Sequence, residues 1–137
     1  MMYSEGQIQG IFILTAIPSF SMTTVKGGYE PRYKIMMRLP EHLLEPVGRS
    51  LTAMNIHHVM IRERGRRVDS IIIRRRFDIL RVCDIMPNSP TKSKSWRKFK
   101  RVMEMVRNGE HLEEDSKYRF EMILNENENE ETNPSSR

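Results

Sequence analysis

Hydrophobic periodicity predicts a helix followed by two strands in the first 40 residues. Residues 5–17 carry apolar residues at helical spacing, in a stripe so wide that the helix must be buried on most sides. We expect Pro18 to end this helix, because the proline ring clashes with the preceding turn. Residues 19–26 and 31–39 alternate with a period of two, which predicts a hairpin that turns at Gly27 and Gly28.

The same alternation assigns the strand residues to two faces of a sheet. The residues expected to face inward are Phe20, Met22, Tyr33, Ile35, Met37 and Leu39. The residues expected to face outward are mostly polar or cationic, namely Ser19, Ser21, Thr23, Val25, Arg32, Lys34, Met36 and Arg38. The pattern therefore predicts one covered face and one open, basic face.

The second half of the chain repeats the order of helix and hairpin. Residues 41–54 predict a helix, and Asn55 suits its C-terminus. Residues 57–64 and 67–75 predict a second hairpin across Gly65, with Val59 and Ile61 facing inward and Met60, Arg62 and Arg64 outward. Further helices are predicted at 77–86, 96–107 and about 112–124. The third helix has two alternative apolar faces, one with Phe77, Leu80 and Cys83 and the other with Ile79, Val82 and Met86.

Length and composition indicate one α+β domain. The chain has 137 residues, which we divide into a domain at 1–124 and an acidic, low-complexity tail at 125–137 that we expect to be disordered. The longest uncharged apolar run, Ile11 to Ile17, is too short to span a membrane, and because no charged segment leads into it we do not expect it to be a secretory signal. Cys83 is the only cysteine, so no intrachain disulfide or cysteine-based zinc site is expected.

The charge is unevenly distributed along the chain. The formal net charge is +5, but residues 1–111 carry 20 cations against 10 anions, whereas the remainder is acidic. Arginine outnumbers lysine by 16 to 7. A basic body with an acidic tail favours a polyanionic partner, and a basic solvated surface is the alternative.

Arginine can bind guanine through two hydrogen bonds or neutralise a phosphate, so cations on the open face are candidate nucleic-acid contacts. Asp69 could accept a hydrogen bond from cytosine or pair with Arg67. The adjacent His57 and His58 would point to opposite faces of a strand, so no metal site is expected there. The candidate nucleic-acid contacts are Ser21, Thr23, Arg32, Lys34, Arg38, Arg62, Arg64, Arg67, Asp69, Arg74, Arg75 and Arg76.

Several local strings, in this order, resemble the LAGLIDADG homing endonucleases of the single-motif type. They are Pro18-Ser19-Phe20 (Gly-Ser-Phe in the family), PRYKIMMR, the stretch at 62–65, TKSKSWRKFKRVMEMV and GEHLEED. The resemblance implies an αββαββα fold, with further C-terminal helices, whose saddle-shaped antiparallel sheet lies in the DNA major groove. It also places Lys92 and Lys94 in a region that carries a lysine near the scissile phosphate.

The motif helix departs from the family at the position that matters for catalysis. The family's helix ends in an acidic residue that binds a divalent cation, whereas this chain has Thr15 or Ile17 there, and no carboxylate between Gly6 and Tyr29. Hard cations need oxygen ligands. We therefore expect no catalytic residue, metal or cofactor, and expect that the chain is not an enzyme. The alternatives are an active endonuclease with a displaced metal site and an interaction protein with an incidental basic face.

The expected function is binding of RNA or DNA by a relative that has lost cleavage. A maturase, a DNA-binding repressor, and a component of an organellar ribonucleoprotein or ribosome all fit, and the arginine excess slightly favours RNA. By family analogy the setting is a mitochondrion or chloroplast, and otherwise the cytoplasm. Because the motif helix pairs with a copy in the family, we expect Ile11, Phe12 and Leu14 to form an interface with a second copy or with a foreign partner.

Overall fold

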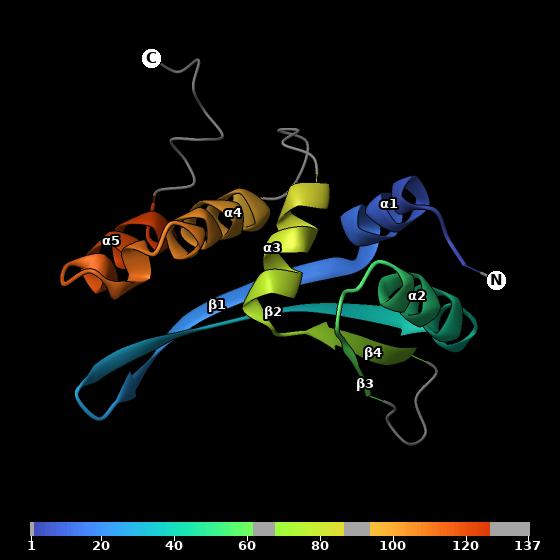
Figure 1. The fold of residues 1–137 in the computed structure, drawn as a ribbon, viewed down its shortest axis with the longest axis horizontal. Helices are drawn as coiled ribbons and strands as arrows, with labels where there is room; N and C mark the ends of the chain where they lie inside the picture. The colour runs from blue at the N-terminus through green and yellow to red at the C-terminus, as the bar shows by residue number, and fades with distance from the viewer. Residues whose placement is uncertain (1, 62–67, 87–93, 127–137) are drawn as a thin grey trace, which may run out of the picture.

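The computed structural model describes residues 2–61, 68–86 and 94–126, which fold in the predicted order of elements. Figure 1 shows the elements along the chain. They are α1 (Glu5–Thr15), β1 (Ala16–Val25), β2 (Gly28–Pro40), α2 (Glu41–Ala53), β3 (Val59–Ile61), β4 (Val68–Ile73), α3 (Arg76–Ile85), α4 (Lys94–Arg107), a 3-10 turn (Glu110–Leu112) and α5 (Ser116–Leu124).

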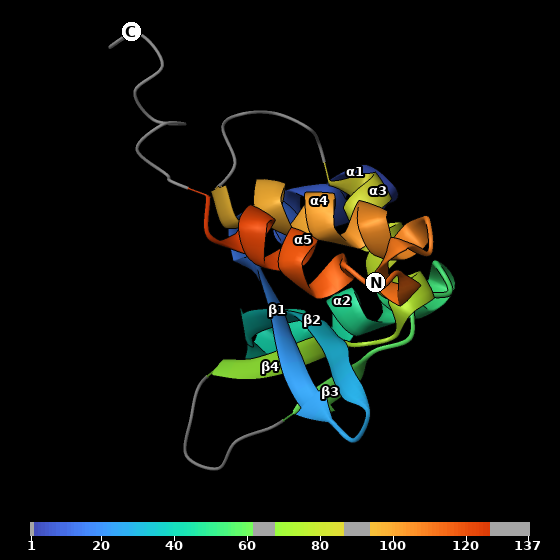
Figure 2. The same cartoon turned by 90° about the vertical axis from the view of Figure 1, so that its left-hand side faces the viewer.

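The four strands form one antiparallel sheet in the order β1-β2-β4-β3. Figures 1 and 2 show the helices gathered on one side of this curved sheet, so that its other face is uncovered in the described part of the chain. The long β1–β2 hairpin extends beyond the shorter β3–β4 pair (Figure 1). The α+β class, with helices on one face and an open opposite face, is as predicted.

The first helix ends two residues earlier than expected. Ser4 caps α1 by accepting a hydrogen bond from the backbone N–H of Gln7, whose side chain in turn accepts from the backbone N–H of Ser4. The helix stops at Thr15, and Pro18 lies inside β1, paired with Ile35. The prediction that Pro18 ends the helix is therefore wrong. Proline is tolerated here because β1 is an edge strand.

The core lies between the helices and the covered face of the sheet. Ile8 and Phe12 of α1 are fully buried there, together with Ile35 and Met37 of β2 and Ile71 of β4. Phe12 was expected at a partner interface, and its burial corrects that expectation. The second half of the helix is apolar on all sides, because residues 11–14 are all apolar, so sequence periodicity could not show which side meets the sheet.

Helix α3 buries all the residues of one predicted apolar face, and all those of the other face except Phe77. Ile79, Val82 and Met86 are buried, as are Leu80 and Cys83. Phe77, however, is 74% exposed, and the Arg76 guanidinium lies over its ring at 5.0 Å from the centroid. Phe77 precedes the part of α3 that packs on the core, which explains why an apolar residue at helical spacing stays exposed.

Helices α4 and α5 cover the long hairpin. The Phe20 ring of β1 packs against Phe120 of α5 with centroids 5.2 Å apart. Near the tip of the hairpin, the Tyr29 hydroxyl is hydrogen-bonded to the Ser116 hydroxyl at the start of α5. These contacts fix the orientation of the hairpin, and with it the outward side chains of β1 and β2.

The side chains of β3 point to the opposite faces from those predicted. Val59 and Ile61 are 46% and 37% exposed, whereas Met60 is partly buried against the core. The end of the Met60 side chain fills the space over Gly48 of α2, where an added Cβ would meet it. Because side chains alternate along a strand, a phase error of one residue moves each of them to the other face.

Candidate nucleic-acid interface

The open face of the sheet is built from cross-strand rows of side chains. In the β1–β2 hairpin, Ser19 pairs with Lys34, and Ser21 pairs with Arg32. Thr23 is the next residue of β1 on the same face, nearer the hairpin tip, and it is exposed. Ser19, Ser21 and Arg32 are exposed, and Lys34 is half-buried. The strand alternation thus places hydroxyl and cationic groups next to one another, as predicted.

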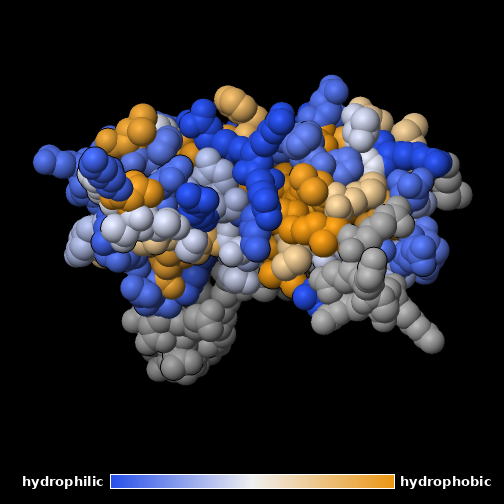
Figure 3. Space-filling view, turned by 90° about the horizontal axis from the view of Figure 1, so that it is seen from below, coloured by the Kyte–Doolittle hydropathy of each residue, from blue (hydrophilic) through white to orange (hydrophobic). Residues whose placement is uncertain are grey.

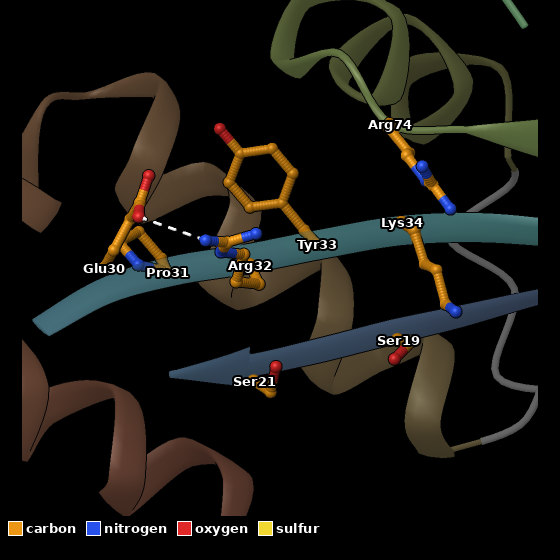
Figure 4. Close-up of a pocket in the computed structure, with 8 residues that line it drawn as sticks. All are labelled: Ser19, Ser21, Glu30, Pro31, Arg32, Tyr33, Lys34 and Arg74. Atoms are coloured by element: carbon orange, nitrogen blue, oxygen red, sulfur yellow. Dashed lines mark hydrogen bonds and ion pairs between the residues drawn. The ribbon is translucent and has the colours of Figure 1, made fainter. Parts of the chain in front are cut away.

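A shallow cavity of about 650 Å³ lies over these rows and over the end of β4. Figure 4 shows Lys34 of β2 and Arg74, which directly follows β4, approaching it from neighbouring strands, with Ser19 and Ser21 on β1. The cavity is lined by Ser19, Ser21, Glu30, Pro31, Arg32, Tyr33, Lys34 and Arg74. Three cations and three hydroxyls against one carboxylate suit this cavity to an anion, such as phosphate, or to the acceptor edge of a base.

Charge pairing within the cavity is weak. The Arg32 guanidinium lies 3.5 Å from the Glu30 carboxylate, and both side chains are more than half exposed, so the ion pair leaves Arg32 able to bind another anion. Burial raises the pKa of the Tyr33 phenol, the positive charge of Arg76 opposes this rise, and Glu30 adds to it. Tyr33 is therefore neutral at pH 7.

The other candidate cations in the described part of the chain do not line this cavity. Arg38 is exposed on the open face two rows further along β2, opposite Ser70 of β4. Arg75 and Arg76 are exposed, but they form the N-cap and first residue of α3 and do not extend β4 as predicted. The structure thus brings together Arg32, Lys34 and Arg74 and leaves Arg75 and Arg76 at a helix start.

Asp69 lies away from the open face. It is 6% exposed and pairs in the sheet with Leu39, which is fully buried on the covered face. This burial does not fit the predicted contact with a cytosine amino group. The candidates Arg62, Arg64, Arg67 and Lys92 lie outside the described residues, and so does the side chain of Lys94, which begins α4.

Sequence reasoning missed an apolar row on the same face. Ile17, Met36, Ile72 and Val59 lie in register across β1, β2, β4 and β3. The alternation of β2 placed Met36 outward, but the register between strands distant in sequence is not visible in the chain itself. The inverted phase of β3 hid Val59 as well.

The end of α1 does not fit a divalent cation. Thr15 donates its hydroxyl hydrogen to the Ile11 carbonyl oxygen at 2.7 Å, and Ile17 supplies only an apolar side chain. In residues 2–61, 68–86 and 94–126, no three histidine, cysteine or acidic side chains are grouped as metal ligands. A metal ion at this helix end would need carboxylates from outside the helix.

The fold matches solved structures of LAGLIDADG homing endonucleases. I-TnaI superposes with a TM-score of 0.71 at 18% identity, covering 90% of this chain and 86% of that one. I-LtrWI bound to target DNA gives 0.71 at 12% identity, over 90% and 43% of the two chains. I-AabMI bound to uncleaved DNA gives 0.66 at 14%, over 97% and 50%. The chain thus spans most of I-TnaI and about half of the other two.

No protein-family model and no curated protein matches the sequence. The structural likeness shows the LAGLIDADG fold, and it corrects one expectation. We expected that the chain is not an enzyme, but the three neighbours are homing endonucleases, so the fold is one that enzymes use. None of the helices in the described part of the chain is long and apolar enough to cross a membrane.

Proposed function

We propose that this protein binds duplex DNA through the open face of its sheet. The observation that carries the proposal is the clustering of Arg32, Lys34 and Arg74 on a face that no described helix covers. Phosphate contacts from such cations supply affinity, and contacts to base edges supply specificity. The DNA-bound neighbours with the same fold support this choice of ligand.

The shape of the face favours DNA over double-stranded RNA. The long β1–β2 hairpin is a two-stranded ribbon, and the roughly 12 Å wide major groove of B-DNA admits such a ribbon. The major groove of A-form RNA is deep and narrow, so the side chains of such a ribbon cannot reach its base edges. The arginine excess, which favoured RNA in the sequence, serves equally well for guanine and phosphate in DNA.

Fluorescence anisotropy with labelled nucleic acids tests this proposal. Random-sequence duplex DNA, duplex RNA and single-stranded RNA of equal length are titrated with the full chain at several salt concentrations. We expect duplex DNA to bind most tightly, with an affinity that falls steeply with salt because counterions are released. Tighter binding to either RNA would contradict the choice of DNA, and no salt-dependent binding to any of them would refute the proposal as a whole.

Site-specific cleavage is the second candidate function, favoured by the neighbours being homing endonucleases. Because the end of α1 does not fit a metal ion, the metal site would have to be displaced. The test is incubation of a selected DNA target with Mg²⁺, with and without EDTA. A specific double-strand cut that EDTA abolishes supports this function, and its absence leaves binding as the activity.

A partner at α1 completes the proposal. Leu14 is 84% exposed, and the surface over Gly10 is open, since a Cβ added there would meet nothing within 4 Å. Ile11 is half-buried beside them. We propose a homodimer through this side of α1. A chain that spans about half of I-LtrWI would need a second copy to present a face of similar length.

The cellular setting rests on the family resemblance alone. A role as a maturase or in an organellar ribonucleoprotein or ribosome stays a prediction, as does the mitochondrial or chloroplast location. Purification of the native protein, followed by sequencing of the DNA and RNA bound to it, tests both. Enrichment of ribosomal or intron RNA would favour these roles over the DNA-binding function.

A further inference from the structure

A complete row of apolar side chains crosses the middle of the open face. Ile17 pairs with Met36, Met36 with Ile72, and Ile72 with Val59, so the row has one member on each strand. Ile17 and Val59, at its two ends, are 56% and 46% exposed, whereas Ile72 in the interior is 5% exposed. Figure 3 shows a hydrophobic patch beside a hydrophilic band on this side of the molecule.

Rows that contain polar and cationic residues flank the apolar row on both sides. Towards the hairpin tip lie Ser19 and Lys34, with Arg74 close by across the cavity. On the other side, Arg38 pairs with Ser70 in the next row, and this row ends on β3 at Ile61, which is 37% exposed. Open-face rows are two residues apart, about 6.8 Å along a strand, which is about two base-pair steps. Each row therefore faces its own pair of base pairs if the strands follow the groove.

The chemistry of the row restricts which base it can face. In the major groove thymine exposes an apolar 5-methyl group beside its O4 acceptor, whereas guanine, cytosine and adenine expose hydrogen-bond donors or acceptors and no methyl group. Isoleucine, valine and methionine cannot hydrogen-bond, so polar base edges pressed against them would lose water without gaining a partner. Uracil lacks the methyl group, so RNA gives the row nothing comparable to bind.

We propose that the accessible members of this row, Ile17, Met36 and Val59, recognise thymine methyl groups, and that the buried Ile72 holds the row together between Met36 and Val59. The face would then select a DNA site with a thymine-rich step, flanked by guanine beside Lys34 and Arg74, because lysine and arginine bind guanine O6 and N7. This inference rests on the proposed DNA-binding function. It adds a sequence preference and a reason for discriminating DNA from RNA.

Methyl deletion in the DNA provides the direct test. A target is selected from random duplexes with the full chain, and deoxyuridine then replaces thymidine at single positions. Over the apolar row we expect each lost methyl group to weaken binding by roughly fourfold, the equilibrium change that corresponds to burying one methylene-sized group. The same replacement elsewhere in the site serves as the control and should leave affinity unchanged.

Variants connect this effect to the row. Ile17→Ser and Val59→Ser alter exposed side chains, so the fold should persist. Each variant should bring the ratio of affinities for the thymidine and deoxyuridine duplexes closer to one. Leu112→Ser removes an apolar side chain that is 81% exposed outside the sheet and is the matched control. In this control the preference should be retained.

The possible failures can be distinguished. Tight binding to a selected site that is insensitive to methyl removal would overturn the thymine inference and leave the DNA-binding proposal intact. The same holds if Ile17→Ser and Val59→Ser disperse an oligomer without changing affinity, because the row would then be a protein contact. Absence of any salt-dependent DNA binding would refute both proposals.

Discussion

The indole N–H of Trp96 donates a hydrogen bond to the Ala16 carbonyl oxygen, with the two heavy atoms 3.1 Å apart. Trp96 is buried near the start of α4, and Ala16 is the residue at which α1 ends and β1 begins. The contact thus ties a C-terminal helix to the point where the chain enters the open-face sheet. Its neighbour Phe99 packs edge-on against the indole, with ring centroids 5.6 Å apart.

Replacing Trp96 should destabilise the fold. In Trp96→Phe the Ala16 carbonyl loses this donor and the smaller ring leaves a cavity, so we expect the free energy of unfolding to fall by about 1–3 kcal/mol. Urea denaturation followed by circular dichroism measures the change. Tyr118→Phe, at a side chain that is 64% exposed, is the control and should leave stability unaltered. An equal stability of the two variants would argue against a structural role for the Trp96 contact.

Removing the cations of the open-face cavity should weaken DNA binding. Lys34→Ala and Arg74→Ala should each cost about 1–3 kcal/mol of binding free energy if the residue contacts a base. If the residue contacts a phosphate, the slope of log K against log salt concentration should become shallower by about 0.9. Arg49→Ala removes the same charge from α2, where Arg49 pairs with Glu45 at 3.3 Å, and is the control. Equal effects of all three variants would indicate that net charge alone governs affinity.

The exposed and buried sides of α1 should respond differently to substitution. Leu14→Glu should dissociate the proposed homodimer without lowering the stability of the monomer, because Leu14 is 84% exposed. Phe12→Ala should lower the free energy of unfolding by about 3–5 kcal/mol, since Phe12 is fully buried. Sedimentation velocity and urea denaturation measure the two effects. A wild-type chain that stays monomeric at high concentration would refute the homodimer.

The thiol of Cys83 should be unreactive in the folded protein. Cys83 is 5% exposed, and burial raises the pKa of its thiol from 9.0 to about 12, with Lys100 opposing the rise. Since the thiolate is the reactive form, iodoacetamide at pH 8 should label the chain only in denaturant. Rapid labelling of the native protein would show that α3 opens readily.

The same shift predicts how Cys83 affects stability in alkali. The folded-state pKa is the higher one, so the contribution of Cys83 is fully present below pH 9, where both states hold the proton. Between pH 9 and about pH 12 the unfolded state loses its proton first, and the free energy of unfolding should fall. Cys83→Ala should remove this component of the pH dependence, as urea denaturation across that range would show.

Alternation of polar and apolar residues made the first hairpin predictable from sequence. From Ser19 to Thr23 and from Arg32 to Ile35, polar or cationic residues separate the apolar ones, so Arg32 and Lys34 had to lie on the face of the sheet that Ile35 does not occupy. The absence of carboxylates between Gly6 and Tyr29 was likewise fixed by the sequence, whatever the fold. The order of helices and strands followed from local periodicity, because each element buries its own apolar face.

Tertiary contacts decided what local periodicity leaves open. Ile17, Met36, Ile72 and Val59 form one row only because β2 pairs with β1 and β4, and β4 with β3. The sequence determined which side chains each strand of the first hairpin can present. The packing of α1 on the sheet decided that Phe12 is buried while Leu14 is exposed, and the packing of α2 decided that Met60 faces α2. Where apolar residues lie on both sides of an element, its sequence gives no preferred direction until a neighbouring element covers one side.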